Sequence, residues 1–74
     1  MPTPKTRSAA YRRFLAKLIK ARTDAGLNQR EAARRLRKTQ SFVSRCETGD
    51  RRVDIVELQA FARIYRKTVQ DFLP

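Results

Sequence analysis

The chain has 74 residues, enough for one small domain, and its 18 Lys and Arg against 7 Asp and Glu give a formal net charge of +11. A single cysteine, Cys46, excludes an intrachain disulfide, and the lack of histidine excludes a zinc site of the Cys/His type. Such a charge surplus in so short a chain favours an anionic partner, and nucleic-acid phosphate is the commonest one.

Residues 1–7 contain two prolines and two basic residues without apolar periodicity, so we expect a flexible basic tail there. From Ser8 onward, apolar residues recur at helical spacing while basic residues occupy the other face. This pattern predicts a first helix that ends at Gly26, because glycine adopts the left-handed conformation of a helix terminus at low cost. Its apolar face consists of Tyr11, Phe14, Leu15, Leu18 and Ile19.

Two short helices are predicted next. Asn28 suits the N-cap of a helix over residues 29–36, and Glu31 stands at the position that completes a capping box. After a tight connection, Thr39 can cap a third helix over residues 40–48, which ends at the following glycine.

Asp54 suits the N-cap of a fourth helix, with Arg66 and Lys67 in its last turn, where cations are favourable. A last turn of helix over residues 69–73 follows. The pattern therefore predicts an all-α fold of five helices in one domain, residues 8–74. The core face of the fourth helix is Ile55, Leu58, Phe61, Ala62 and Tyr65.

The second and third helices can pack across a tight turn only if their inward positions are small or apolar. Those positions hold Ala33, Leu36, Val43 and Cys46. Phe42 could stack on a sugar or a thymine methyl group, but we interpret it as partly packed against neighbouring helices, and Cys46 as a core residue. The outward face of the third helix presents Gln40, Ser41, Ser44 and Arg45. Glutamine can pair with the edge of adenine, arginine with that of guanine, and serine with either.

Two segments carry a family resemblance: residues 26–33, GLNQREAA, and residues 39–49, TQSFVSRCETG. They resemble the Cro/C1-type helix-turn-helix proteins, also called the XRE family. Residues 51–58, RRVDIVEL, are similar to that family's approach to its fourth helix. The resemblance covers residues 11–74 and implies a compact, lambda-repressor-like DNA-binding domain with its helix-turn-helix in the second and third helices.

The resemblance also implies roles for single residues. Gln29 would bind a phosphate and brace Gln40, which would read an adenine. Ser41, Ser44 and Arg45 would be the other base-reading residues. Thr39, Arg51 and Arg52 complete the predicted phosphate-binding set. An ion pair between Arg22 and Glu47 would join the first and third helices without reading bases. Where the family has a glycine in the turn, this chain has Arg37, and positive φ at a non-glycine residue is strained.

These features predict a sequence-specific transcriptional regulator, a repressor of the phage or prophage type, that binds a palindromic operator as a homodimer. The alternative is an antitoxin-like or accessory module whose DNA binding is coupled to a protein partner. An apolar end formed by Val69, Phe72 and Leu73 could be the docking surface or the dimer seam.

Other classes of function find no support in the sequence. No glycine-rich phosphate loop, metal-ligand spacing or nucleophile with a base is present, so we expect neither an enzyme nor a cofactor. No apolar run approaches the ~20 residues that cross a bilayer, and residues 1–10 lack a signal-peptide core. We therefore expect a cytoplasmic protein with no membrane contact.

Overall fold

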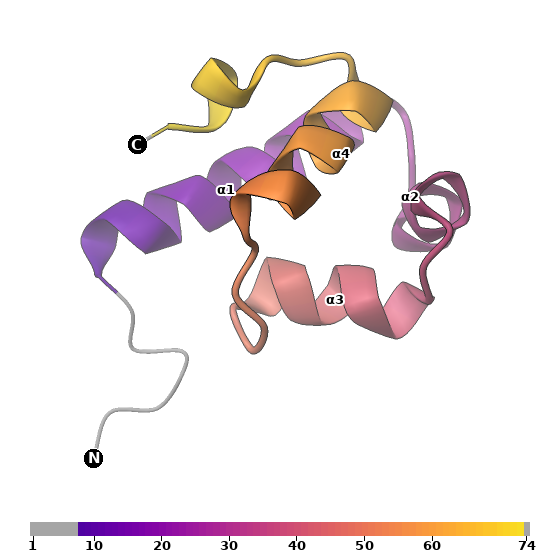
Figure 1. Ribbon diagram of the computed structural model, residues 1–74, viewed down its shortest axis with the longest axis horizontal. Helices are drawn as coiled ribbons and strands as arrows, with labels where there is room; N and C mark the ends of the chain where they lie inside the picture. The colour runs from indigo at the N-terminus through magenta and orange to yellow at the C-terminus, as the bar shows by residue number, and fades with distance from the viewer. Residues whose placement is uncertain (1–7, 74) are drawn as a thin grey trace.

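Four α-helices and one short 3-10 helix make up the part of the chain that the structure, a computed structural model, describes: residues 8–73 (Figure 1). The predicted tail over residues 1–7 lies outside the described residues. No strand occurs between residues 8 and 73, as the all-α prediction required. The elements are α1 (Ala9–Asp24), α2 (Gln29–Leu36), α3 (Gln40–Thr48), α4 (Ile55–Tyr65) and the 3-10 helix η1 (Val69–Phe72).

The predicted fifth helix is thus a 3-10 turn and not an α-helix. Its closing hydrogen bonds, from Asp71 N to Thr68 O at 3.0 Å and from Leu73 N to Gln70 O at 3.2 Å, join residues three apart. Pro74 follows Leu73, and a residue before proline avoids the α-helical region. Leu73 accordingly has extended backbone angles, so the segment ends before an α-helical turn can form.

Side-chain caps start the helices at the predicted residues. Asn28 and Asp54 each form a full capping box, with Glu31 and Glu57 as their respective partners. Thr39 Oγ1 accepts a hydrogen bond from the backbone N–H of Phe42 at 3.1 Å. These bonds satisfy N–H groups that a helix terminus leaves without a partner.

Left-handed residues end three of the helices. Gly49 follows α3 with φ +90°, whereas Arg37 follows α2 and Arg66 follows α4, with φ +59° and +58°. Arg66 therefore lies beyond the last turn of α4, which contains Arg63 instead, contrary to the sequence prediction. α1 ends at Asp24, shortly before Gly26 at φ +75°.

The core is formed by one face of each helix. Two predicted core residues lie at the surface: Ile19 is 38% exposed and Ile55 is 60% exposed. Ile55 is the first residue of α4, and the buried residues of this helix begin only at Leu58. Phe72, which we expected at an exposed docking surface, is buried and packs edge-on against Phe14 at 6.4 Å. The fully or nearly fully buried side chains are Leu18, Ala32, Val43, Cys46, Phe61, Tyr65 and Phe72.

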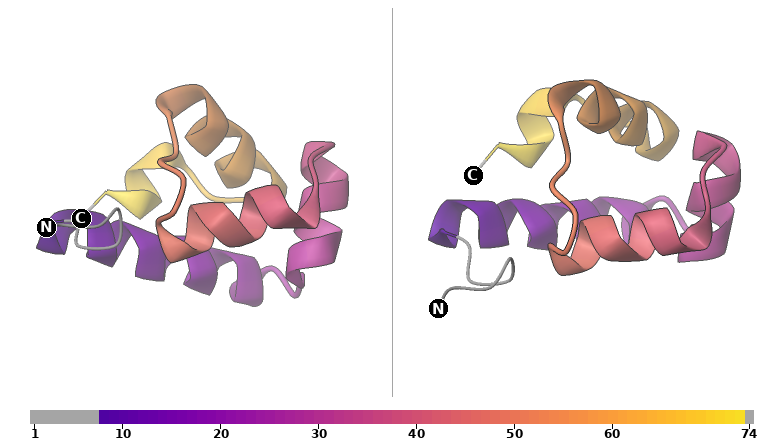
Figure 2. Two further views of the ribbon diagram at one scale, coloured as in Figure 1. Left: turned by 90° about the horizontal axis from the view of Figure 1, so that it is seen from below. Right: turned by 60° about the horizontal axis from the view of Figure 1, so that its bottom comes forward.

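The arrangement leaves α3 at the rim of the molecule. α3 lies beside α1, α4 covers the other side of the core, and η1 packs against α1 (Figure 2). α2 packs on α3 across the turn at residues 37–39. In Figure 1, α3 occupies the lower edge and no other labelled helix lies below it. One long face of α3 is therefore open to a partner.

Candidate nucleic-acid interface

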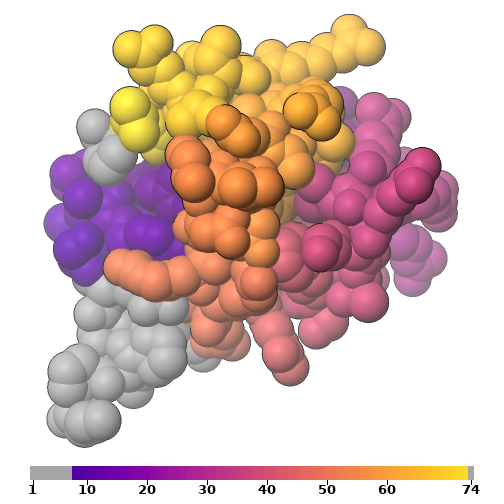
Figure 3. Space-filling model, in the orientation of Figure 1, coloured from indigo at the N-terminus to yellow at the C-terminus, as the bar shows by residue number. Residues whose placement is uncertain are grey.

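The outward face of α3 carries the four residues that the sequence assigned to it. Gln40, Ser41 and Arg45 are exposed, and Ser44 is half-buried. On the inward face, Val43 and Cys46 are fully buried in the core. The space-filling view shows α3 and the segment after it forming the lower surface (Figure 3). α3 therefore presents amide, hydroxyl and guanidinium groups along one accessible helix face.

A buried carboxylate fixes one flank of α3 to the rest of the fold. Glu47 accepts hydrogen bonds from Arg22 Nε at 2.7 Å, Arg22 Nη2 at 3.2 Å and Gln29 Nε2 at 2.8 Å. Arg22 Nη1 also donates to the carbonyl of Leu27 at 3.0 Å. The hydrogen bond to Glu47 raises the pKa of Arg22 above its ordinary value, against the opposing effect of burial. The carboxylate of Glu47 in α3 thus binds side chains of both α1 and α2.

Arg22 and Glu47 form the ion pair that the resemblance implied, whereas Gln29 is placed differently. The amide nitrogen of Gln29 donates to Glu47, not to Gln40, so the expected brace between the two glutamines is not the hydrogen bond formed here. Gln29 is half-buried at the first position of α2, and Gln40 is exposed at the first position of α3.

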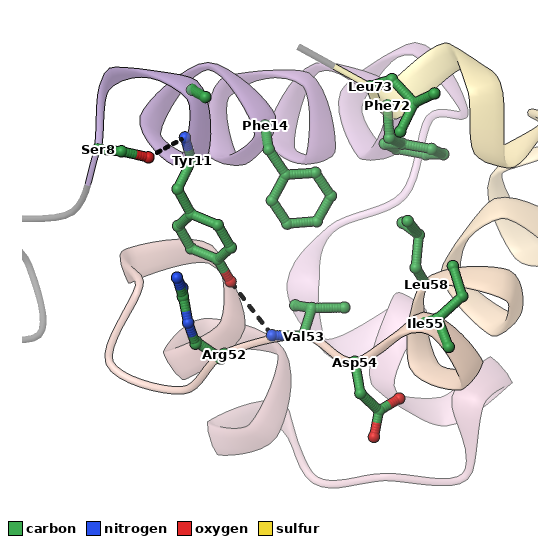
Figure 4. A pocket seen from close by; sticks show the side chains of 11 residues that line it. Ser8, Tyr11, Phe14, Arg52, Val53, Asp54, Ile55, Leu58, Phe72 and Leu73 are labelled. Atoms are coloured by element: carbon green, nitrogen blue, oxygen red, sulfur yellow. Dashed lines mark hydrogen bonds between the residues drawn. The ribbon is translucent and has the colours of Figure 1, made fainter.

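The loop after α3 is fixed at two points. The guanidinium of Arg51 binds both carboxylate oxygens of Glu57, Nη1 to Oε1 and Nη2 to Oε2, each at 2.8 Å. This bidentate bond lowers the pKa of Glu57, although burial opposes the shift. Arg52 lies over the ring of Tyr11, 4.5 Å from its centroid, and the Tyr11 hydroxyl accepts a hydrogen bond from Val53 N at 3.1 Å (Figure 4). Both arginines therefore have defined positions.

Phe42 packs as the sequence predicted, and it also contacts two cations that the prediction missed. Its ring stacks on Phe61 with centroids 6.2 Å apart and an interplanar angle of 8°. Lys38 Nζ lies 5.3 Å and Arg51 Cζ 4.8 Å from the ring centroid, both within cation–π range. The only sequence signal for this cluster was a basic residue in the turn, four positions before an aromatic one.

The remaining chemistry of the described residues is limited. Burial raises the pKa of the Cys46 thiol, which makes it a weak nucleophile. Residues 8–73 contain no group of three or more acidic or cysteine side chains that could hold a metal ion. Within the same residues, no helix is both long enough and apolar enough to traverse a bilayer. An open face of donors surrounded by cations suits a polyanion better than a small substrate.

Comparisons with known proteins agree with this geometry. A family model described as a helix-turn-helix domain matches residues 11–71. An XRE-family like protein from Pseudomonas syringae pv. tomato str. DC3000 has a similar solved structure, with a TM-score of 0.81. Its sequence is 39% identical, and the match covers 86% of this chain and 78% of that chain. No curated protein matches the sequence.

Proposed function

The chain belongs to the helix-turn-helix domain family and is of the XRE type, and from this we propose that it is a sequence-specific transcriptional repressor that reads duplex DNA with α3. The observation that carries the proposal is the outward face of α3. Donor and acceptor side chains gather there on a helix that Glu47 and Phe42 hold in place from either side. A rigid helix of this kind fits the major groove, which has a distinct pattern for each base pair.

Four side chains are proposed to contact base edges. Gln40 can form two hydrogen bonds with adenine, and Arg45 can form two with guanine. Ser41 and Ser44 can donate to or accept from several bases, so they contribute less discrimination. All four belong to the outward face, and Ser44 is the one that is half-buried.

A second set is proposed to contact phosphates. Gln29 stands at the N-terminus of α2, where backbone N–H groups and the helix dipole favour an anion. Thr39 caps α3 and keeps its hydroxyl hydrogen available for a phosphate oxygen. Arg51 and Arg52 extend the set along the loop after α3. Such contacts fix the register of the protein on DNA but carry no base information.

The protein is proposed to bind a palindromic operator as a homodimer, because one unit of this size covers only a few base pairs and half-sites recur about one helical turn apart, ~34 Å. An apolar groove of about 400 Å³ opens between the start of α1, the start of α4 and η1 (Figure 4). Ile55 lines it, and the neighbouring Val56 is 69% exposed. We propose that these residues contribute to the seam between two copies.

The alternative function, an antitoxin-like module coupled to a protein partner, has less support. It relied on an apolar end at residues 69–73, but Phe72 is buried and Val69 is half-buried, which leaves Leu73 as the exposed residue. Leu73 lines the same groove as Ile55, so one surface would serve either partner. A stoichiometric heteropartner in native extract, with a monomeric pure protein, would favour this alternative.

The proposed function is tested by selecting duplexes from a random library at about 150 mM salt. An enriched, two-fold symmetric site is expected. On that site, Arg45→Ala should relax specificity at one base pair. Arg52→Ala should instead weaken binding to matched and scrambled duplexes alike. Equal affinity of the wild type for all duplexes would refute the proposal, and the reverse behaviour of the two variants would exchange their roles.

A further inference from the structure

Lys38, Phe42, Arg51 and Glu57 form a cluster on the flank of α3, and only Arg51 among them was given a role by the family resemblance. Lys38 and Arg51 are thirteen residues apart and belong to the turns on either side of α3, yet both cations contact the ring of one residue, Phe42. The hydrogen bond from Arg51 and, more weakly, the charge of Lys38 lower the pKa of Glu57. All four side chains are therefore close neighbours.

The position of Phe42 on α3 gives this cluster its orientation. At 3.6 residues per turn, Phe42 and Glu47 are about 140° apart around the helix and lie on opposite flanks. Glu47 holds its flank through Arg22 and Gln29, and Phe42 holds the other through Phe61 of α4. A helix in the major groove has a sugar–phosphate strand on either side, so each flank of α3 meets one strand.

The charge of the cluster suits such a strand. Glu57 forms a bidentate pair with Arg51 and neutralises its charge, which leaves the positive charge of Lys38 as the surplus. Lys38 is exposed, and within residues 8–73 its ammonium group contacts the ring of Phe42 and forms no ion pair with an acidic side chain. The ring of Phe42 keeps the ammonium group beside α3, where the long lysine side chain would otherwise sample many rotamers.

We propose that Lys38 is a DNA phosphate ligand on the α4-facing flank of α3, and that Phe42 is the positioning residue that holds Lys38 and Arg51 at this site. The site rests on the proposed function, because it assumes that α3 enters the groove. Arg51, already among the phosphate ligands of the proposed function, also bridges Phe42 and Glu57 and so fixes the loop. The ligand is the backbone phosphate, so the site adds affinity without base preference.

The test measures affinity against salt concentration for the full chain, on the selected duplex and on a scrambled one. Lys38→Gln should reduce the magnitude of the slope of log K against log salt by about 0.9. It should also weaken binding to both duplexes about fivefold at 150 mM salt. Lys67→Gln is the matched control. It removes one cation that lines a pocket with Lys17 and Asp71, near η1, and should leave the slope unchanged.

Phe42 is tested by substitutions that keep an apolar side chain. Phe42→Leu should weaken binding to both duplexes about two- to fivefold. Phe42→Tyr, which keeps the ring, should bind with wild-type affinity. In Phe42→Leu, a further Lys38→Gln change should cost less than it does in the wild type, because the two residues act together. If Phe42→Leu does not fold, Lys38→Gln still decides the phosphate site, and Phe42→Met, which keeps an apolar side chain without a ring, takes the place of Phe42→Leu.

The outcomes separate this site from the proposed function. If Lys38→Gln has the same slope and affinities as Lys67→Gln, the phosphate site is refuted while specific binding by the wild type stands. If Phe42→Leu binds as the wild type does, the positioning role is refuted. If the wild type does not discriminate between duplexes, the proposed function fails, and the salt slopes still show whether Lys38 contacts phosphate.

Discussion

Arg22 of α1 and Glu47 of α3 form a bidentate ion pair whose side chains are only 14% and 4% exposed. Because a buried carboxylate is costly without partners, the pair ties the orientation of α3 to that of α1. The outward face of α3 is then fixed relative to the core before any ligand binds.

Glu47→Gln should therefore destabilise the protein strongly. The substitution keeps the shape of the side chain but leaves the Arg22 guanidinium without its counterion, and breaking a buried pair costs about 3 kcal/mol or more. Lys20→Gln breaks the exposed pair with Asp24, whose side chains are 75% and 44% exposed, and should cost less than ~0.5 kcal/mol. Urea unfolding of both variants compares them, and equal small losses would show that the buried pair has no structural role.

Arg37→Gly should stabilise the protein. Arg37 has φ +59°, and a left-handed residue other than glycine costs about 1 kcal/mol. A gain of that size corresponds to a rise of about 4–8 °C in Tm for a domain this small. Arg34→Gly is the matched control, because it also exchanges an exposed arginine for glycine but inside α2, where the loss should be about 1 kcal/mol. A Tm change of the same sign in both variants would contradict this account.

Tyr65→Phe should leave the stability unchanged or raise it by about 1 kcal/mol. The Tyr65 hydroxyl is buried and has no hydrogen-bond partner among the described residues, and burial raises its pKa well above the ordinary value of 10.0. Removing an unpaired buried hydroxyl relieves a desolvation cost. Tyr11→Phe, by contrast, removes the hydrogen bond to Val53 N and should cost about 1 kcal/mol. Calorimetric Tm values measure both, and a clear loss in Tyr65→Phe would reveal a partner for its hydroxyl.

Glu57 should make the protein less stable in acid. Arg51 lowers the pKa of Glu57 below its ordinary value of 4.5, so the folded state favours the ionised form. The resulting stability is present above pH 4.5 and is lost as the pH falls through the folded pKa. Glu57→Gln should be less stable than the wild type at pH 7, and the difference should shrink below pH 4.5. A difference that stayed constant from pH 7 to pH 3 would exclude this linkage, as urea titrations at several pH values would show.

Local features of the fold could be predicted from the sequence, because they depend on residues only three or four positions apart. The capping box that begins at Asn28 and the N-cap at Asp54 are of this kind. Burial at the ends of helices could not be predicted in this way. Ile55 matches the apolar face of α4 but is exposed, because the start of the helix does not contact the core. Phe72 is buried only because η1 packs against α1.

The candidate site, too, could be predicted from the sequence only where it depends on one short segment. The outward face of α3 followed from helical periodicity and family resemblance, since those positions lie on one short segment. The partner of Gln29 did not, because the choice between Gln40 and Glu47 depends on how α2 meets α3. Lys38 was missed, although it stands only four positions before Phe42, because it lies outside α3 in the turn, where helical spacing does not predict contacts.

Base reading by α3 is best tested by selection from a random duplex library at about 150 mM salt, with the wild type and Gln40→Ala in parallel. Gln40 is exposed at the first position of α3, so its removal should leave the fold intact. We expect a two-fold symmetric site that the wild type enriches and that Gln40→Ala loses or blurs at one position in each half. Identical sites for both proteins, or no enrichment by the wild type, would contradict base reading by α3.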